Sequence, residues 1–289
     1  MLVDTHLHLW DRARFTYRWL ETEPDLPTRF LPADLAAQGA PDGAVFMEAG
    51  RAPEQGLAEA EWVAGLAQAW PALRGIVAFA ALEEGDRVAA ALERLRALPL
   101  VVGVRRLLQD EPDDLLISPV LVAGLRAVAA AGLPFDACVR HAQLPALLAL
   151  RRSVPEVVMV LDHLGKPPIH AGWGAPEAAA WARAIRGLAA EPNTVVKLSG
   201  VAPEAGPGDV LAQARPFVES ALAAFGPDRS LVGSDWPVSA APADAPSYRD
   251  WFAFLGDGLG LRGTERDAVL GSTAVRTYRL DVDRARSLQ

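Results

Sequence analysis

The sequence predicts an α/β protein that folds as a (β/α)8 TIM barrel. Eight short apolar runs, rich in β-branched residues, alternate with longer segments of helical spacing. Several of these runs are continuously apolar, which is typical of a parallel sheet covered on both faces. The length of 289 residues suits one barrel of about 250 residues with modest insertions. We therefore expect a single barrel domain over residues 1–289, distorted where rim loops are extended, with an open doubly wound sheet as the alternative.

The expected strands lie between turn-forming residues and span 2–9, 43–48, 75–82, 101–108, 134–140, 157–161, 194–198 and 230–233. Between them, apolar residues recur at helical spacing in three sets: Trp62, Leu66 and Trp70; Val88, Leu92 and Leu95; and Leu121, Leu125 and Val128. Residues 10–31 are too many for a minimal first loop, and residues 200–207 are rich in Gly and Pro. Both segments are expected to form rim loops that shape a pocket.

The composition narrows the possible partners. The net charge is −8, from 36 acidic and 28 basic residues, and no basic stripe is present, so nucleic acid is not expected to bind. The single cysteine, Cys138, cannot form an intrachain disulfide and lies in an apolar run. The first residues show no signal segment, and no uncharged run approaches the roughly 20 residues of a membrane span. We expect a cytoplasmic protein with a small-molecule substrate, either a monomer or a homodimer.

Two histidines lie two residues apart at the end of the first expected strand, His6 and His8. In an extended strand, residues i and i+2 point to the same face, so both imidazoles can converge on one point. The carboxyl ends of barrel strands are also where catalytic groups lie. Two imidazoles there suit a zinc-like divalent ion, although polar strand-end residues bonded to the neighbouring backbone are the alternative.

Other expected strands also end on or carry ionisable residues, namely Glu48, Asp162, His163, Lys197 and Asp235. Ionisable side chains in an otherwise apolar barrel are costly, which favours a shared functional site. The eighth strand of a barrel lies beside the first, which would place Asp235 next to the two histidines. Its carboxylate would bind a metal or accept the proton of a water that attacks a carbonyl. His163 would orient the substrate, bind a metal or protonate a leaving group.

Further candidates come from the same strand ends. Arg105 or Arg106 would hold a substrate carboxylate or hydroxyl by a forked contact, or form a surface salt bridge. Lys197 is a second candidate for substrate binding. Aromatic residues after strand ends would form walls for a sugar ring or pack beneath loops: Trp10, Trp173 and Trp236. His141 and His170 would supply a further nitrogen near the site.

Two common catalytic classes are not indicated. Neither the G-x-x-x-x-G-K nor the G-x-G-x-x-G loop is present, which argues against nucleotide chemistry. The G-x-S-x-G turn is also absent, which argues against a serine hydrolase.

With these residues placed, the chain resembles the amidohydrolase superfamily, in its "amidohydrolase 2" branch of TIM-barrel hydrolases. The resemblance covers essentially the whole length. It is carried by Val-Asp-Thr-His-Leu-His-Leu-Trp-Asp at 3–11, Gly-Val-Arg-Arg-Leu-Leu-Gln-Asp-Glu-Pro at 103–112, Leu-Asp-His-Leu-Gly-Lys-Pro at 161–167, Val-Lys-Leu-Ser-Gly at 196–200 and Gly-Ser-Asp-Trp-Pro-Val at 233–238. Within the branch it resembles the L-fuconolactonases, the L-rhamnonolactonases and the 2-pyrone-4,6-dicarboxylate hydrolases.

This resemblance implies hydrolysis of a cyclic ester, most simply a sugar-acid lactone of carbohydrate catabolism, with Asp235 as general base. It implies one divalent ion, zinc or manganese, bound by His6, His8 and Asp235, with Glu48 and His163 as further ligands. His141 is displaced from the position of the strand-five histidine of many members, so a binuclear centre is not expected. In a metal-free alternative of the pyrone-hydrolase type, the histidines and Arg105 would polarise the carbonyl.

Two other functions stay open at this point. A decarboxylase of the same branch would use the same barrel to cleave a carbon–carbon bond. A barrel that binds a small ligand without catalysis is the more remote alternative.

Overall fold

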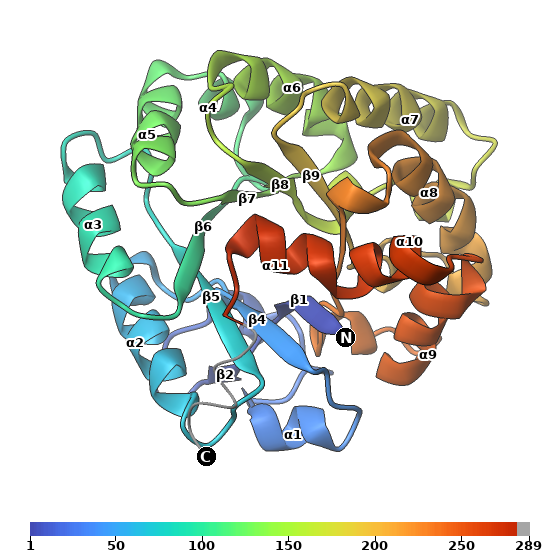
Figure 1. The fold of residues 1–289 in the computed structure, drawn as a ribbon, viewed down its shortest axis with the longest axis horizontal. Helices are drawn as coiled ribbons and strands as arrows, with labels where there is room; N and C mark the ends of the chain where they lie inside the picture. Colours follow the sequence, from blue (N-terminus) through green and yellow to red (C-terminus); the bar gives the residue numbers. More distant parts are fainter. Residues whose placement is uncertain (282–289) are drawn as a thin grey trace.

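The computed structural model describes residues 1–281 and forms a barrel around one eight-stranded sheet (Figure 1). The strand order is β1-β4-β5-β6-β7-β8-β9-β10, and adjacent strands along this order are parallel. The strands are β1 (Val3–Leu7), β4 (Gly43–Met47), β5 (Leu73–Phe79), β6 (Val101–Leu107), β7 (Phe135–Cys138), β8 (Met159–Leu161), β9 (Thr194–Leu198) and β10 (Ser230–Val232). The predicted barrel is therefore confirmed.

The barrel closes between its first and last strands through the segment that follows β10. The backbone N–H of Asp235 donates to the carbonyl of His6 at 2.6 Å, and that of His8 donates to the carbonyl of Trp236 at 2.9 Å. In this seam between β1 and β10, the Thr5 hydroxyl also donates to the carbonyl of Val232 at 2.7 Å. The seam thus fixes the Gly-Ser-Asp-Trp-Pro segment against the two histidines of β1.

Helices cover the outside of the barrel. The longer ones are α2 (Gly56–Leu66), α3 (Arg87–Arg96), α5 (Pro119–Ala130), α6 (Leu144–Ser153), α7 (Pro176–Ala189) and α8 (Val210–Phe225). Shorter ones are α1 (Pro32–Ala36), α4 (Asp113–Leu116), α9 (Tyr248–Ala253), α10 (Gly263–Asp267) and α11 (Thr273–Tyr278). A two-stranded ribbon of β2 (Trp10–Asp11) and β3 (Arg29–Phe30) forms the base of the first rim loop. The chain therefore adds only short elements to the eight strand–helix units.

Helix α11 closes the amino-terminal end of the barrel. In Figure 1 it lies across the middle of the ring of strands. Ala274 and Tyr278 of α11 pack in one cluster with residues from the strands, including Val3, Val45 and Val160. The interior is thus sealed at this end, so access to the barrel centre must come from the carboxyl ends of the strands.

The predicted helical faces are only partly correct. The apolar sets of α3 and α5 are buried as expected. In α2, however, the buried residues include Ala60 and Val63, whereas Trp62 and Leu66 are half-buried. Trp70 lies beyond the end of that helix. A tryptophan side chain is large and can cover the edge of a core from a neighbouring face of the helix. The spacing of the tryptophans therefore did not identify the buried face of α2.

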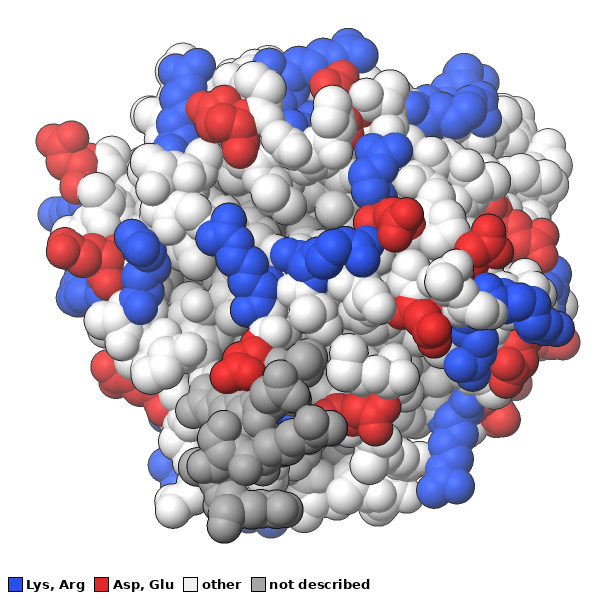
Figure 2. Space-filling model, in the orientation of Figure 1, with Lys and Arg blue, Asp and Glu red and all other residues white. Residues whose placement is uncertain are grey.

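The face around α11 carries interspersed charges. Figure 2 shows Lys and Arg among Asp and Glu on this side of the molecule, as the sequence predicts for a surface without a basic stripe. Among residues 1–281, no helix is long and apolar enough to cross a membrane.

Candidate active site

A cavity of about 1000 Å³ opens at the carboxyl ends of the barrel strands. Its floor includes His8, Arg105, His163 and Asp235. Its walls come from both predicted rim loops: Arg18, Trp19, Thr22, Glu23, Asp25 and Leu26 from the first, and Gly200, Pro203 and Glu204 from the second. The expectation that these loops shape a pocket is therefore confirmed.

Three histidines surround one oxygen of Asp235. The Nε2 atoms of His8, His6 and His163 lie 3.4, 3.7 and 3.8 Å from Asp235 Oδ1. The other carboxylate oxygen, Oδ2, accepts a hydrogen bond from the Ser239 hydroxyl at 2.8 Å. The structure thus brings together residues from both ends of the sequence, as the barrel prediction required.

The opposite nitrogen of each imidazole is held by the protein. His8 Nδ1 lies 3.0 Å from the carbonyl oxygen of Met47, which can only accept, so the ring carries its proton there. His163 Nδ1 lies 3.0 Å from the Ser199 hydroxyl. His6 Nδ1 lies 3.3 Å from Asp162 Oδ1. These contacts fix the ring orientations and turn the Nε2 atoms toward Asp235.

Two of these residues adopt the left-handed backbone conformation that side chains seldom occupy. Asp235 has φ +58° and His163 has φ +53°. Such conformations cost of order 1–3 kcal/mol each and are concentrated at functional sites. The strand ends are therefore held in geometries that local preference alone does not favour.

Ion pairs lie directly beneath and beside the histidines. Arg105 Nε lies 2.8 Å from Glu48 Oε1, and Arg51 Nη1 lies 2.5 Å from Glu48 Oε2. Lys197 Nζ lies 2.6 Å from Asp136 Oδ1 and 3.0 Å from Asp162 Oδ1. Every one of these side chains is at most 4% exposed, so the charges interact with little screening by water.

Burial and neighbouring groups set the protonation states. Burial lowers the pKa of His163 to about 4 and lowers the pKa of His6 well below its ordinary value. Burial by itself would raise the pKa of Asp235, but His163 and the neighbouring histidines hold it below its ordinary value. At neutral pH the site therefore presents an ionised carboxylate beside two neutral imidazoles. Neutral imidazole and carboxylate are also the forms that bind metals.

The donor set fits one divalent ion. One ligand atom from each of His6, His8 and Asp235 lies within 4.8 Å of the others. Ligand atoms of a tetrahedral zinc site are about 3.4 Å apart, which is close to the Asp235 distances of both histidines. His6, Asp162 and His163 form a second such group. Glu48 belongs to neither, because both of its carboxylate oxygens are bound by arginines.

Several residues predicted to bind substrate lie elsewhere. Trp10 is fully buried and donates its indole N–H to the carbonyl of Pro27, because the first rim loop folds over it. Trp236 packs against Tyr248 outside the cavity lining. Lys197 is fully buried between two aspartates, so substrate cannot reach it. Only Arg105, of the four predicted, lines the cavity.

Other residues at the cavity are not predicted by the sequence. Trp19 lines the cavity, whereas Trp10 is buried next to it. The indole N–H of Trp19 donates to the carbonyl of Ala49 at 2.8 Å. Cys138 lines the wall at the end of β7. Asp162, next to His163, is predicted only as an ionisable strand-end residue, and the structure places its Oδ1 3.3 Å from His6 Nδ1. The sequence places Trp19 in the long rim loop, but this position does not show whether its side chain lines the cavity or packs beneath the loop.

The remaining candidates lie away from the floor. His141 Nδ1 lies 3.1 Å from the carbonyl of Lys166, and neither His141 nor exposed His170 lines the cavity. Arg106 forms salt bridges with Glu83 and Glu111. Trp173 packs edge-on against Trp181 and Phe217 while remaining half exposed. Of the two candidate arginines, Arg105 lines the cavity and Arg106 does not.

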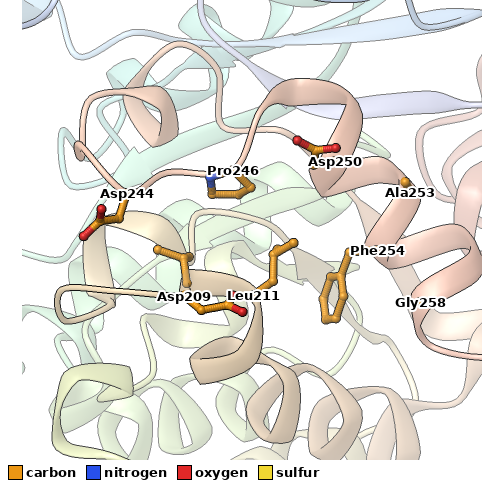
Figure 3. Close-up of a pocket in the computed structure, with 9 residues that line it drawn as sticks. Asp209, Leu211, Asp244, Pro246, Asp250, Ala253, Phe254 and Gly258 are labelled. Atoms are coloured by element: carbon orange, nitrogen blue, oxygen red, sulfur yellow. The ribbon is translucent and has the colours of Figure 1, made fainter.

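A second hollow of about 390 Å³ lies beside α8 and α9. Figure 3 shows Asp209, Asp244 and Asp250 around its apolar centre of Leu211 and Phe254. Asp209 caps α8 through Ala212, Asp244 accepts from the N–H of Gly208, and Asp250 accepts from the Ser247 hydroxyl. These carboxylates therefore have structural partners, and the chemistry is concentrated in the large cavity.

Gly200 is predicted to be essential for the position of His163. A Cβ at Gly200 would lie 2.2 Å from His163 Nδ1, and the backbone φ is +62°. We expect Gly200→Ala to displace the imidazole and lower turnover about 100-fold, the scale of a misplaced catalytic group. Gly172→Ala is the matched control, because φ is +84° there and nothing lies within 4 Å of the added carbon. Equal activity of the two variants would contradict this role.

The barrel and the histidine–aspartate cluster at its strand ends form a candidate active site. The model of the amidohydrolase family ("Amidohydrolase") matches residues 3–280. The chain belongs to this family, and the resemblance inferred from its motifs is confirmed.

Two curated relatives are lactonases. L-fucono-1,5-lactonase of Burkholderia ambifaria is 34% identical over 286 residues, which cover 96% of this chain and 96% of the relative. L-rhamnono-gamma-lactonase of Scheffersomyces stipitis is 27% identical over 200 residues, which cover 63% of this chain and 60% of the relative. The similarity to the first therefore extends over nearly the whole of both proteins.

Solved structures show the same architecture. An amidohydrolase from Burkholderia multivorans, crystallised with bound zinc, superposes with a TM-score of 0.85 at 30% identity, covering 97% of this chain and 100% of that one. A putative 2-pyrone-4,6-dicarboxylic acid hydrolase from Pseudomonas putida gives a TM-score of 0.72 at 24% identity, covering 96% and 97%. At that identity the second likeness concerns the fold alone.

Proposed function

We propose that this protein is a lactonase that hydrolyses the cyclic ester of a sugar-acid lactone. The observation that carries the proposal is the cluster of His6, His8, His163 and Asp235 at the floor of an open cavity. The lactonase relatives support the substrate class, and the ionised state of Asp235 supports hydrolysis by an attacking water.

In the proposed reaction, Asp235 removes a proton from a water as the water oxygen bonds to the lactone carbonyl carbon. The bond between that carbon and the ring oxygen then breaks, and Asp235 returns the proton to the departing oxygen. His163, 3.8 Å from Asp235, orients the departing oxygen. Arg105 lines the cavity and places a permanent positive charge near the carbonyl oxygen, where negative charge develops.

His6, His8 and Asp235 would hold a divalent ion such as zinc or manganese. When bound, the ion would supply Lewis-acid polarisation of the carbonyl and acidify a nearby water. Zinc in the Burkholderia multivorans structure supports this assignment. The Nδ1 contacts of His6 and His8 with Asp162 and Met47 keep both rings oriented for that role.

The proposal is tested with a pH indicator, because ring opening at neutral pH releases a proton from the new carboxylic acid. The purified protein is assayed on γ- and δ-lactones of sugar acids and on a carboxylated pyrone, with and without chelator, and its metal content is measured. We expect sugar-lactone hydrolysis that falls on chelation and returns when zinc or manganese is added.

The alternatives give different results. Chelator-resistant hydrolysis would remove the metal from the mechanism and leave the histidines and Arg105 to polarise the carbonyl. Preference for the pyrone would overturn the sugar-lactone assignment. Release of carbon dioxide from an aromatic acid, without lactone hydrolysis, would indicate a decarboxylase instead.

A further inference from the structure

A line of buried polar side chains crosses the barrel from the closing helix to the active site. Tyr278 of α11 donates its hydroxyl to Asp136 Oδ1 at 2.6 Å. The same oxygen lies 2.6 Å from Lys197 Nζ, which lies 3.0 Å from Asp162 Oδ1. That oxygen in turn lies 3.3 Å from His6 Nδ1. All five side chains are at most 2% exposed.

The position of Lys197 decides what His6 can do. Its ammonium lies 3.5 Å from His6 Nδ1, close to the 3.3 Å that separates the same nitrogen from Asp162. If the ammonium donated to Nδ1, the ring proton would move to Nε2, the atom that faces Asp235. If the Nδ1–H instead donates a hydrogen bond to Asp162, Nε2 keeps its lone pair. Arg105 Nη1 lies 3.4 Å from His6 Nε2 and can only donate, which favours the second state, and the two carboxylates hold Lys197 at shorter distances than His6 does.

We propose that Asp136 and Tyr278 are positioning residues for His6, acting through Lys197 and Asp162. Asp136 binds the ammonium at 2.6 Å, and together with Asp162 it holds the ammonium 3.5 Å from the imidazole Nδ1, so that this contact stays the longest of the three. Tyr278 fixes the shared oxygen of Asp136 from the opposite end of the barrel. Helix α11 thereby contributes to the proton arrangement of the site as well as sealing the barrel. The catalytic consequence rests on the proposed function, whereas the imidazole proton position does not.

The test compares Asp136→Asn and Tyr278→Phe with the wild-type protein. Loss of a residue that orients a ligand histidine typically costs 10- to 100-fold in activity. We expect a fall of this size in kcat for Asp136→Asn and a several-fold fall for Tyr278→Phe, with KM unchanged in both. Tyr17→Phe is the matched control, because Tyr17 also donates its hydroxyl to a buried carboxylate, that of Glu59, but has no contact with this line.

The second measurement needs neither metal nor substrate. Nitrogen-15 NMR of the five histidines, with His6 assigned through His6→Gln, reports which ring nitrogen carries the proton in the chelated protein. We expect an Nδ1 proton on His6 in the wild type and a shift toward an Nε2 proton in Asp136→Asn and Tyr278→Phe. Should Asp136→Asn not fold, Tyr278→Phe gives both readouts.

An unchanged His6 proton in the variants would overturn the inference, as would a kcat loss no larger than that of Tyr17→Phe. A wild-type protein that hydrolyses no lactone would overturn the proposed function, and the NMR result would still decide the inference.

Discussion

Replacement of Asp235 by asparagine is expected to lower kcat about 1000-fold while the protein remains folded. General acid–base catalysis contributes about 10²- to 10⁴-fold, and the neutral amide can neither remove the proton of water nor supply a negatively charged ligand. Asparagine is a suitable replacement because it tolerates the left-handed backbone found at this position, φ +58°. The measurement is steady-state lactone hydrolysis, with circular dichroism to verify the fold.

Two further variants serve as comparisons for Asp235→Asn. Ser239→Ala removes only the hydrogen bond to Asp235 Oδ2 and should cost several-fold in kcat. Asp244→Asn changes an aspartate of the second hollow and should leave the rate unchanged. A folded Asp235→Asn protein that keeps more than about a tenth of the wild-type kcat would refute the role of Asp235 as general base.

Replacement of Arg105 by methionine is expected to lower the free energy of unfolding by about 3 kcal/mol and to abolish most activity. Arg105 is buried and contacts Glu48 at 2.8 Å and Asp162 at 3.4 Å. Removing one partner of a buried ion pair leaves an uncompensated charge, at a typical cost of 3–5 kcal/mol. The lower end applies because Arg51 still contacts Glu48. Urea unfolding followed by tryptophan fluorescence measures the loss.

The adjacent residue supplies the control. Arg106→Met removes salt bridges to Glu83 and Glu111, which are partly exposed residues that follow β5 and β6. Such pairs contribute about 0–1 kcal/mol, so stability and activity should change little. A similar loss of stability in both variants would contradict the explanation that burial of the ion pairs makes Arg105 the more important of the two.

The distribution of the strands was predictable because it depends on local pattern. Short apolar runs, helical spacing and turn residues are adjacent in sequence, and all eight strands appear where the runs occur, with ends shifted by a few residues. The common direction of the His6 and His8 side chains is also a local property, because residues i and i+2 of a strand point to the same face. The seam that joins Asp235 to them needed only the closure of the barrel.

The walls of the site were not predictable in the same way. Trp10 and Trp19 belong to the same long loop, yet one is fully buried and the other lines the cavity. The difference arises from how that loop folds over β2 and β3, which no short-range spacing encodes. Aromatic character therefore indicated a wall but could not identify the residue.

Periodicity was sufficient to predict the barrel, and parallel strands that end at one edge led us to expect His6, His8, His163 and Asp235 to lie close together. Which charges meet beneath them depends on contacts between strands that are distant in sequence. Glu48 is bound by two arginines, and Lys197 lies between Asp136 and Asp162. The physical reason is that a buried charge takes its role from partners that are distant in sequence, and in a low-dielectric interior a change of partner outweighs any local preference.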